Sequence, residues 1–146
     1  MKKIVAILFL VGFITSSFVM NKSELVIQST QKDEINFSTA SFDEALKEAK
    51  KTGKLIFLDA YTDWCGPCKK MSAHTFTDAN VAKLFNSKFI NLKIEMEKNP
   101  IGPEIARKYS VRAYPSLLFI DGDGKIVKYV VGYQTPDQLI AIGKSL

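Results

Sequence analysis

The feature that most constrains this sequence is a nearly continuous apolar run leading into a closely spaced cysteine pair. The run, LIFLDAY at residues 55–61, is rich in β-forming residues and is typical of a strand buried on both faces. Cys65 and Cys68 follow it, and Pro67 between them suits the first turn of a helix. A buried strand followed by a helix that starts at the thiols predicts an α/β domain.

The other segments supply a mixed set of helices and strands. Helical patterns cover residues 41–53, 75–88, 102–110 and 135–146, and strand patterns cover 34–40 (EINFSTA), 89–96 and the two arms of a hairpin about Asp-Gly-Asp-Gly at 121–124. We expect Ser41, Thr77 and Thr135 as N-caps, with Glu44 completing a capping box and Gly53 ending the first helix.

The predicted order of elements is β-α-β-α-α-β-α-β-β-α. Early strands separated by helices pair in parallel, whereas the late hairpin pairs antiparallel. We therefore predict a mixed central sheet with helices on both faces.

The first 20 residues have the pattern of a secretory signal peptide. Lys2 and Lys3 precede an apolar run from Ile4 to Phe13, and small polar residues follow it. The whole apolar stretch is about 17 residues, the lower limit for spanning a bilayer, so a retained membrane anchor stays the alternative. No cysteine that could carry a lipid stands at the boundary. In both cases we expect the rest of the chain to work in the periplasm or another extracytoplasmic space.

Without that segment about 125 residues remain, the size of one domain. We expect a loose polar leader at 21–34 and a single domain at 35–146. The formal net charge of +5 falls to +3, because Lys2 and Lys3 leave with the segment and no acid does. No basic stripe with interleaved aromatic residues occurs, so nucleic acid is not an expected partner.

The cysteine pair predicts a reactive dithiol. Two cysteines in an exported protein usually form a structural disulfide, but a bridge between Cys65 and Cys68 closes too short a loop to constrain the unfolded chain much. A thiol at a helix start faces free N–H groups and the positive end of the helix dipole, and such thiols have pKa values of roughly 3.5 to 7.5. We expect Cys65 to attack a partner disulfide and Cys68, one turn on, to resolve the mixed disulfide. Gly66 leaves room for a partner chain, and Pro67 stiffens the turn.

An acid inside the apolar run adds to this pattern. Asp59 lies six residues before Cys65, where burial should raise its pKa and suit it to exchange a proton near Cys68. A strand-end acid in contact with solvent is the alternative. Lys93 could be its partner, or could equally face outward from its own strand.

The segment DAYTDWCGPCKKM at 59–71 resembles the thioredoxin superfamily, and the resemblance continues to the end of the chain from about residue 37. It implies a thioredoxin fold and thiol–disulfide exchange. It also implies that Cys65 is the attacking thiol and Cys68 the resolving one. Asp59 and Lys93 match the buried acid of the family and its lysine neighbour.

The resemblance further implies a substrate groove. Pro115 matches the cis-proline that lies against the dithiol, although by itself it is a proline at a strand start, where trans is the default. Gly132 matches the glycine that lines the groove. Trp64 and Tyr114 are candidate contacts with a partner, and Trp64 could equally be a half-buried packing residue.

Three departures from ordinary thioredoxins bear on this expectation. Ala73 stands where they have a kinking proline, and TFTDANV at 75–81 breaks the helix and restarts it. This pattern resembles exported thioredoxin-like domains related to the C-terminal domain of transmembrane disulfide reductases, which deliver electrons to periplasmic partners. Tyr114 before the proline is unusual for the family and leaves the redox direction open.

Other classes of function stay open on the sequence. Cys65, Cys68 and His74 could supply three metal ligands, but zinc normally takes four and no second cysteine pair exists, so we expect no metal. A peptide-binding chaperone with an incidental disulfide could use the groove beside Pro115. For the enzyme we expect no cofactor, a monomer, disulfide-containing exported proteins as substrates and a membrane-bound electron donor. A reducing or isomerising direction is favoured over an oxidising one.

Overall fold

The computed structural model describes residues 33–146, so the predicted signal peptide and nearly all of the predicted leader lie outside the described residues. The elements in this part of the chain are α1 (Phe42–Thr52), β1 (Leu55–Tyr61), α2 (Gly66–Lys70), a π-helical turn η1 (Met71–Thr75), α3 (Ala79–Lys88), β2 (Phe89–Glu95), α4 (Gly102–Lys108), β3 (Ser116–Ile120), β4 (Ile126–Val131) and α5 (Pro136–Lys144). None of the helices between residues 33 and 146 is long and apolar enough to cross a bilayer.

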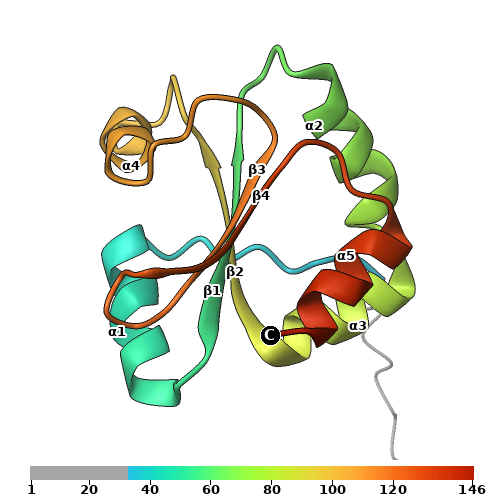
Figure 1. Cartoon of the computed structure of the whole chain (residues 1–146), viewed down its shortest axis with the longest axis horizontal. Coiled ribbons are helices and arrows are strands. Elements are labelled where there is room, and N and C mark those ends of the chain that lie inside the picture. Colours follow the sequence, from blue (N-terminus) through green and yellow to red (C-terminus); the bar gives the residue numbers. More distant parts are fainter. Residues whose placement is uncertain (1–32) are drawn as a thin grey trace, which may run out of the picture.

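The four strands form one sheet in the order β2-β1-β3-β4. β1 pairs in parallel with β2, and the two other pairings are antiparallel. The helices α1 and α4 cover one face of the sheet, and α2, α3 and α5 cover the other (Figure 1). The predicted mixed sheet with helices on both faces is confirmed, and the arrangement is a thioredoxin fold.

The core is divided by the sheet into two clusters. Ile56, Leu58 and Ala60 of β1 pack on the side of α1 and α4. Phe57, which points the other way, packs with Phe85 of α3. Successive side chains of a strand alternate between faces, so Asp59 shares the face of Phe57, the face that the cysteine-bearing helix covers.

The predicted helix ends agree with the structure at three of four positions. Ser41 and Glu44 form the expected capping box, Gly53 ends α1 with φ of 74°, and Thr135 caps α5. The prediction of Thr77 as the N-cap of α3 is wrong. Asp78 is the N-cap, because its carboxylate accepts hydrogen bonds from two N–H groups of the first turn, while the Thr77 hydroxyl donates to Ala73 O.

The predicted first strand at 34–40 is also wrong. The segment has no strand ladder, and a side chain supplies part of its pairing instead. Asn86 Oδ1 accepts from the N–H of Asn36, and Asn86 Nδ2 donates to the carbonyl of Glu34. The N–H of Ser38 donates to a main-chain carbonyl of β2. Such isolated bonds hold the segment against the domain without making it a fifth strand.

Candidate active site

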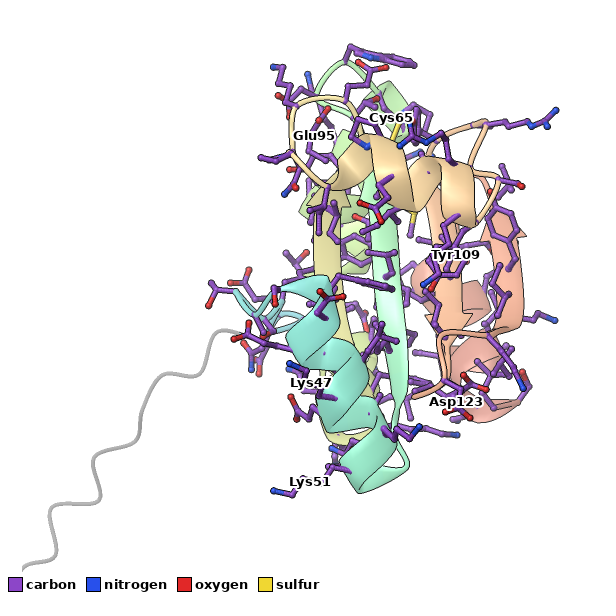
Figure 2. All side chains as sticks on the ribbon, turned by 90° about the vertical axis from the view of Figure 1, so that its left-hand side faces the viewer. Lys47, Lys51, Cys65, Glu95, Tyr109 and Asp123 are labelled. Atoms are coloured by element: carbon purple, nitrogen blue, oxygen red, sulfur yellow. A yellow bond between two sulfur atoms is a disulfide. The ribbon has the colours of Figure 1, made fainter. Side chains whose placement is uncertain are left out.

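Cys65 and Cys68 lie where the sequence predicts, at the start of the helix that follows β1. Cys65 is the N-cap of α2, and the two sulfurs form a disulfide with an S–S distance of 2.11 Å (Figure 2). The N–H of Cys68 donates to Cys65 Sγ at 3.2 Å, so a free N–H of the helix start is aimed at that sulfur. Both residues are nearly buried in this oxidised form, at 3% and 2% exposure. Their expected order of reactivity concerns the dithiol and stays a prediction.

The helix that carries the cysteines continues into a wider, π-helical turn. After α2 the chain makes one π-helical turn, Met71–Thr75, closed by the Phe76 N–H donating to Met71 O at 2.9 Å. The turn contains Ala73, the residue that replaces the kinking proline of ordinary thioredoxins. The inserted residue changes the direction of the side chains that follow, and such turns are frequent at functional sites. The predicted break and restart of the helix is therefore present as a π turn followed by α3.

Asp59 and Lys93 lie opposite each other across the parallel pair β1 and β2. Lys93 Nζ is 3.1 Å from Asp59 Oδ2, and the Asp59 side chain is 1% exposed. Neither carboxylate oxygen accepts a hydrogen bond of good geometry from any residue between 33 and 146, so the ion pair is its polar contact there. The alternative of a solvent-exposed acid at the strand end does not hold.

Burial dominates the electrostatics of this pair. Removal from water raises the pKa of Asp59 above its ordinary value, and the positive charge of Lys93 opposes the rise without cancelling it. A raised pKa makes a carboxylate a stronger proton acceptor than an ordinary one. The role of Asp59 in proton transfer stays a prediction.

Ser72, which the sequence analysis did not single out, joins this pair to the cysteine helix. Its hydroxyl donates to Cys68 O at 3.1 Å and accepts a hydrogen bond from Lys93 Nζ. A surface pocket of about 360 Å³ lies beside them and is lined by Cys68, Lys93 and the buried Thr62 among others. The only sequence signal for Ser72 is its spacing, since a residue four places after Cys68 lies on the same helix face.

Trp64, which directly precedes Cys65, contacts Tyr114, which directly precedes Pro115. Their rings lie edge to face with centroids 5.9 Å apart, and Trp64 is 67% exposed, so it is not a half-buried packing residue. The indole N–H donates to Glu97 Oε2 at 2.9 Å. Partial burial, helped by the negative charge of Glu97, raises the pKa of Tyr114, so its phenol stays protonated at neutral pH. Glu97 is a second residue that sequence reasoning missed, because it follows a different strand.

Of the predicted groove residues, Pro115 is buried and Gly132 is half-buried. The Tyr114–Pro115 peptide bond is cis, as the family resemblance implies. The carbonyl of Pro115 accepts the N–H of Gly132 at 2.8 Å, which fixes the two predicted groove residues side by side. A Cβ on Gly132 or Gly66 would meet no atom within 4 Å, so the space beside both backbones is open. Pro67, between the cysteines, is exposed.

The structure does not assemble the alternative metal site. His74 is exposed on the π turn, whereas the sulfurs of Cys65 and Cys68 are bonded to each other. Residues 33–146 contain no cluster of three His, Cys, Asp or Glu side chains that could hold a metal ion.

Comparison with known proteins connects this site to relatives. The thiol:disulfide interchange protein DsbD of Pasteurella multocida (strain Pm70) is 30% identical over 123 residues, which cover 84% of this chain and 21% of DsbD. The chain thus spans about a fifth of the length of that relative. That relative is a thiol:disulfide interchange protein, and the Cys65–Cys68 pair of this chain fits a disulfide oxidoreductase.

Two solved structures share the fold. One, from Bacteroides thetaiotaomicron and described as a candidate disulphide-isomerase, is 47% identical with a TM-score of 0.66, covering 78% of this chain and 96% of that chain. The other is the reduced C-terminal domain of DsbD from Neisseria meningitidis, 25% identical with a TM-score of 0.60, covering 74% and 96%. The predicted similarity to such C-terminal domains is confirmed.

The family itself follows from a match to most of the chain. A model of the thioredoxin-like domain matches residues 42–146, a stretch that holds the disulfide, the Asp59–Lys93 pair and the cis-proline. The chain therefore belongs to the thioredoxin-like family.

Proposed function

We propose that this protein is an exported thiol–disulfide oxidoreductase that reduces or isomerises disulfides in extracytoplasmic proteins. The observation that carries the proposal is the Cys65–Cys68 disulfide at the start of α2, beside open backbone at Gly66 and Gly132. We include in it the division of the chain into a signal peptide or anchor at 1–20, a leader at 21–34 and one domain at 35–146.

The reaction begins with the protein as a dithiol. The Cys65 thiolate attacks one sulfur of a partner disulfide, and the second partner sulfur leaves and takes up a proton. Cys68 then attacks Cys65 Sγ in the mixed disulfide, which releases the first partner sulfur as a thiol. Two electrons pass to the partner, which ends as two thiols, and the protein ends with the disulfide seen here.

Asp59 handles the proton of Cys68 in this scheme. The carboxylate lies buried on the sheet face under the cysteine helix, and its ion-pair partner Lys93 lines a surface pocket of about 360 Å³ together with Cys68. Cys68 must lose its proton to attack, and a carboxylate with a raised pKa accepts it and returns it when the disulfide is reduced again. The positive charge of Lys93 favours the ionised form of Asp59.

Partner chains bind across the open backbone. Pro115 and Gly132 line one side, while Trp64 and Tyr114 provide an aromatic edge beside the disulfide. Gly66 and Pro67 keep the approach to Cys65 free of bulky side chains. The exposed Trp64 ring and the half-buried Tyr114 ring suit extended, partly apolar segments around a partner cysteine.

The reducing direction is proposed from resemblance. The Gly66-Pro67 pair and the segment at 75–81 resemble reducing members of the superfamily, and DsbD is named as a thiol:disulfide interchange protein. A dithiol persists in an oxidising compartment only when electrons are supplied. We therefore propose a monomer that works in the periplasm, needs no cofactor, and is kept reduced by a membrane-bound donor.

Reduction of a model protein disulfide by the purified protein, with a small dithiol as donor, tests the proposal. Wild type should be active and Cys65→Ser should be inactive, with Cys65→Ser still folded by circular dichroism. Activity that survives in Cys65→Ser would remove the proposal. If wild type lacks reductase activity but suppresses aggregation of an unfolded protein, the chaperone alternative takes its place.

A further inference from the structure

We propose that Ser72 is a positioning residue that holds the Lys93 ammonium beside the Asp59 carboxylate and ties this pair to the cysteine helix. The inference deepens the proposed function, because it rests on Asp59 as the proton acceptor. Nothing in the cysteine motif includes Ser72, and its place follows from contacts alone.

The hydrogen bonds of Ser72 have a fixed direction. A hydroxyl has one proton to donate, and Ser72 gives it to the main-chain carbonyl of Cys68 at 3.1 Å. The ammonium of Lys93 has only donors, so the Ser72 oxygen accepts from it. Ser72 thus links Cys68, on the helix, to Lys93, on the sheet.

Lys93 needs such an anchor because the rest of its surroundings is weakly directional. The ring centroids of Tyr61, Phe76 and Phe37 lie 4.7, 5.1 and 5.6 Å from Lys93 Nζ. Cation–π contacts of this kind tolerate movement of the ammonium. The approach to Asp59 Oδ2 at 3.1 Å is close but lacks hydrogen-bond geometry. The hydrogen bond to Ser72 is the directional contact of this ammonium among residues 33–146.

The Lys93 side chain also has solvent-accessible space into which it can move. Its side chain is 22% exposed, and it lines two surface pockets, one of about 360 Å³ beside Cys68 and one of about 410 Å³ beside Phe37. An ammonium released by Ser72 can move toward water in either pocket. Asp59 would then keep its full desolvation with less compensating charge, and its pKa would rise further.

Several other ionisable groups lie near the Asp59–Lys93 pair and have to be distinguished from Asp59 in a titration. These groups come from the elements around the pair: Tyr61 on β1, Glu95 on β2, Asp63 after β1, Cys68 and Lys69 on α2, and Glu34 before α1. The strand neighbour of Asp59 on β3 is Leu117, which carries no charge. Backbone hydrogen bonds lower the pKa of Glu95, and burial raises the pKa of Tyr61, so neither changes charge between about pH 6 and 9. With the disulfide intact, Cys68 does not titrate.

The direct test is NMR titration of the Asp59 carboxyl carbon in the oxidised protein. Ser72→Ala removes the hydroxyl and favours helix, so it should fold. We expect it to raise the Asp59 pKa by about 1 unit, an effect typical of a weakened neighbouring charge. Ser72→Thr keeps a hydroxyl and should restore the wild-type value. Ser87→Ala is the matched control, because Ser87 bonds only back to Leu84 O on α3.

The pH profile of disulfide reduction is the second readout. Below the Asp59 pKa, Ser72→Ala should be about tenfold slower than wild type, and at higher pH the two rates should converge. An unchanged or lowered Asp59 pKa in Ser72→Ala overturns the proposal. That result would mean that water takes the place of the hydroxyl and holds Lys93 equally well. If wild type does not reduce disulfides but the titration shifts as expected, the proposed function fails and the positioning role stands.

Discussion

The Trp64 indole N–H donates to Glu97 Oε2 at 2.9 Å, so the loop after β2 holds the ring of the residue that directly precedes Cys65. Trp64 is 67% exposed, and water would otherwise allow it several rotamers. Its edge contact with Tyr114 extends the same order to the residue before the cis-proline. If partners bind here as proposed, this surface is arranged before they bind, which lowers the entropy lost on binding.

Glu97→Ala should loosen Trp64 and weaken partner binding. We expect KM for a protein disulfide to rise roughly two- to tenfold with kcat little changed, because one hydrogen bond contributes about 0.5–1.5 kcal/mol. Trp64 is the single tryptophan of the sequence, so its fluorescence anisotropy reports the same loosening directly. Glu97→Gln, which keeps an acceptor, and Glu104→Ala on α4 should behave as wild type. A fall in kcat with unchanged KM would contradict this role.

Cys65 should be the more reactive thiol of the reduced protein. As N-cap of α2 it receives the Cys68 N–H, which favours the thiolate. Limiting iodoacetamide followed by mass spectrometry should find Cys65 labelled first, and the denatured protein should show no such preference. Labelling of Cys68 ahead of Cys65 would reverse the two roles.

Asp59→Asn should raise stability while slowing turnover. Burial raises the pKa of Asp59 in the folded protein, so the native state binds the proton more tightly than the unfolded chain does. Wild type then loses stability as the pH rises from about 4 through the folded pKa, and the asparagine variant does not. We expect the variant to gain about 1–3 kcal/mol at neutral pH and nothing at low pH.

Urea unfolding of the oxidised protein between pH 3 and 9 measures this difference. Glu48→Gln, at an exposed position on α1, should show no pH-dependent gain. In the same variant the resolution step should slow, since the proton acceptor for Cys68 is lost. A stability difference that does not depend on pH, or an unchanged turnover across the range, would leave Asp59 without the proposed role.

Gly132→Ala should impair partner exchange beyond its effect on stability. Gly132 has φ of 94°, where an alanine is strained by about 1–2 kcal/mol, and its Cβ would stand in the open groove. Gly53→Ala is a close control, because Gly53 has φ of 74° and equally open surroundings. It follows α1 at the end of the molecule opposite Cys65, as the positions of Lys51 and Cys65 show (Figure 2).

Both glycine variants should lose similar stability in thermal unfolding. Only Gly132→Ala should raise KM for a protein disulfide, with reactivity toward a small dithiol unchanged. Equal kinetics in the two variants would mean that partners do not pass over Gly132.

Cys68→Ser should trap partners covalently. Cys65 still attacks, but the mixed disulfide has no internal exit. Expressed with its native N-terminus, the variant should accumulate complexes that reductant dissolves, and the double variant with Cys65→Ser should not. Thiol-alkylation of the unaltered protein in cells should find it mostly reduced. No trapped complexes would argue against exchange, and a mostly oxidised protein would change the proposed direction to oxidation.

Local features of the sequence predicted the local structure well. The capping box at Ser41, the N-cap Thr135, the buried strand β1 and the helix start at Cys65 depend on residues within one or two turns of each other. Where two local signals competed the prediction failed. Thr77 and Asp78 are both good N-caps, and the carboxylate of Asp78 reached two N–H groups while the Thr77 hydroxyl bonded to the preceding turn.

The sequence by itself therefore determined the order of elements after residue 40, three of the four predicted helix ends and the spacing of the two thiols, because these are set by short-range sterics and hydrogen bonds. Only the tertiary structure decided that Lys93 faces Asp59 and not solvent, since that depends on the register of β1 with β2. The tertiary structure also placed the Ser72 hydroxyl beside Lys93. It left residues 34–40 without the hydrogen-bond ladder of a strand, and the Asn86 side chain pairs with the backbone of this segment instead. Contacts between residues tens of positions apart follow from how the sheet and helices bury their apolar faces together, which no local pattern encodes.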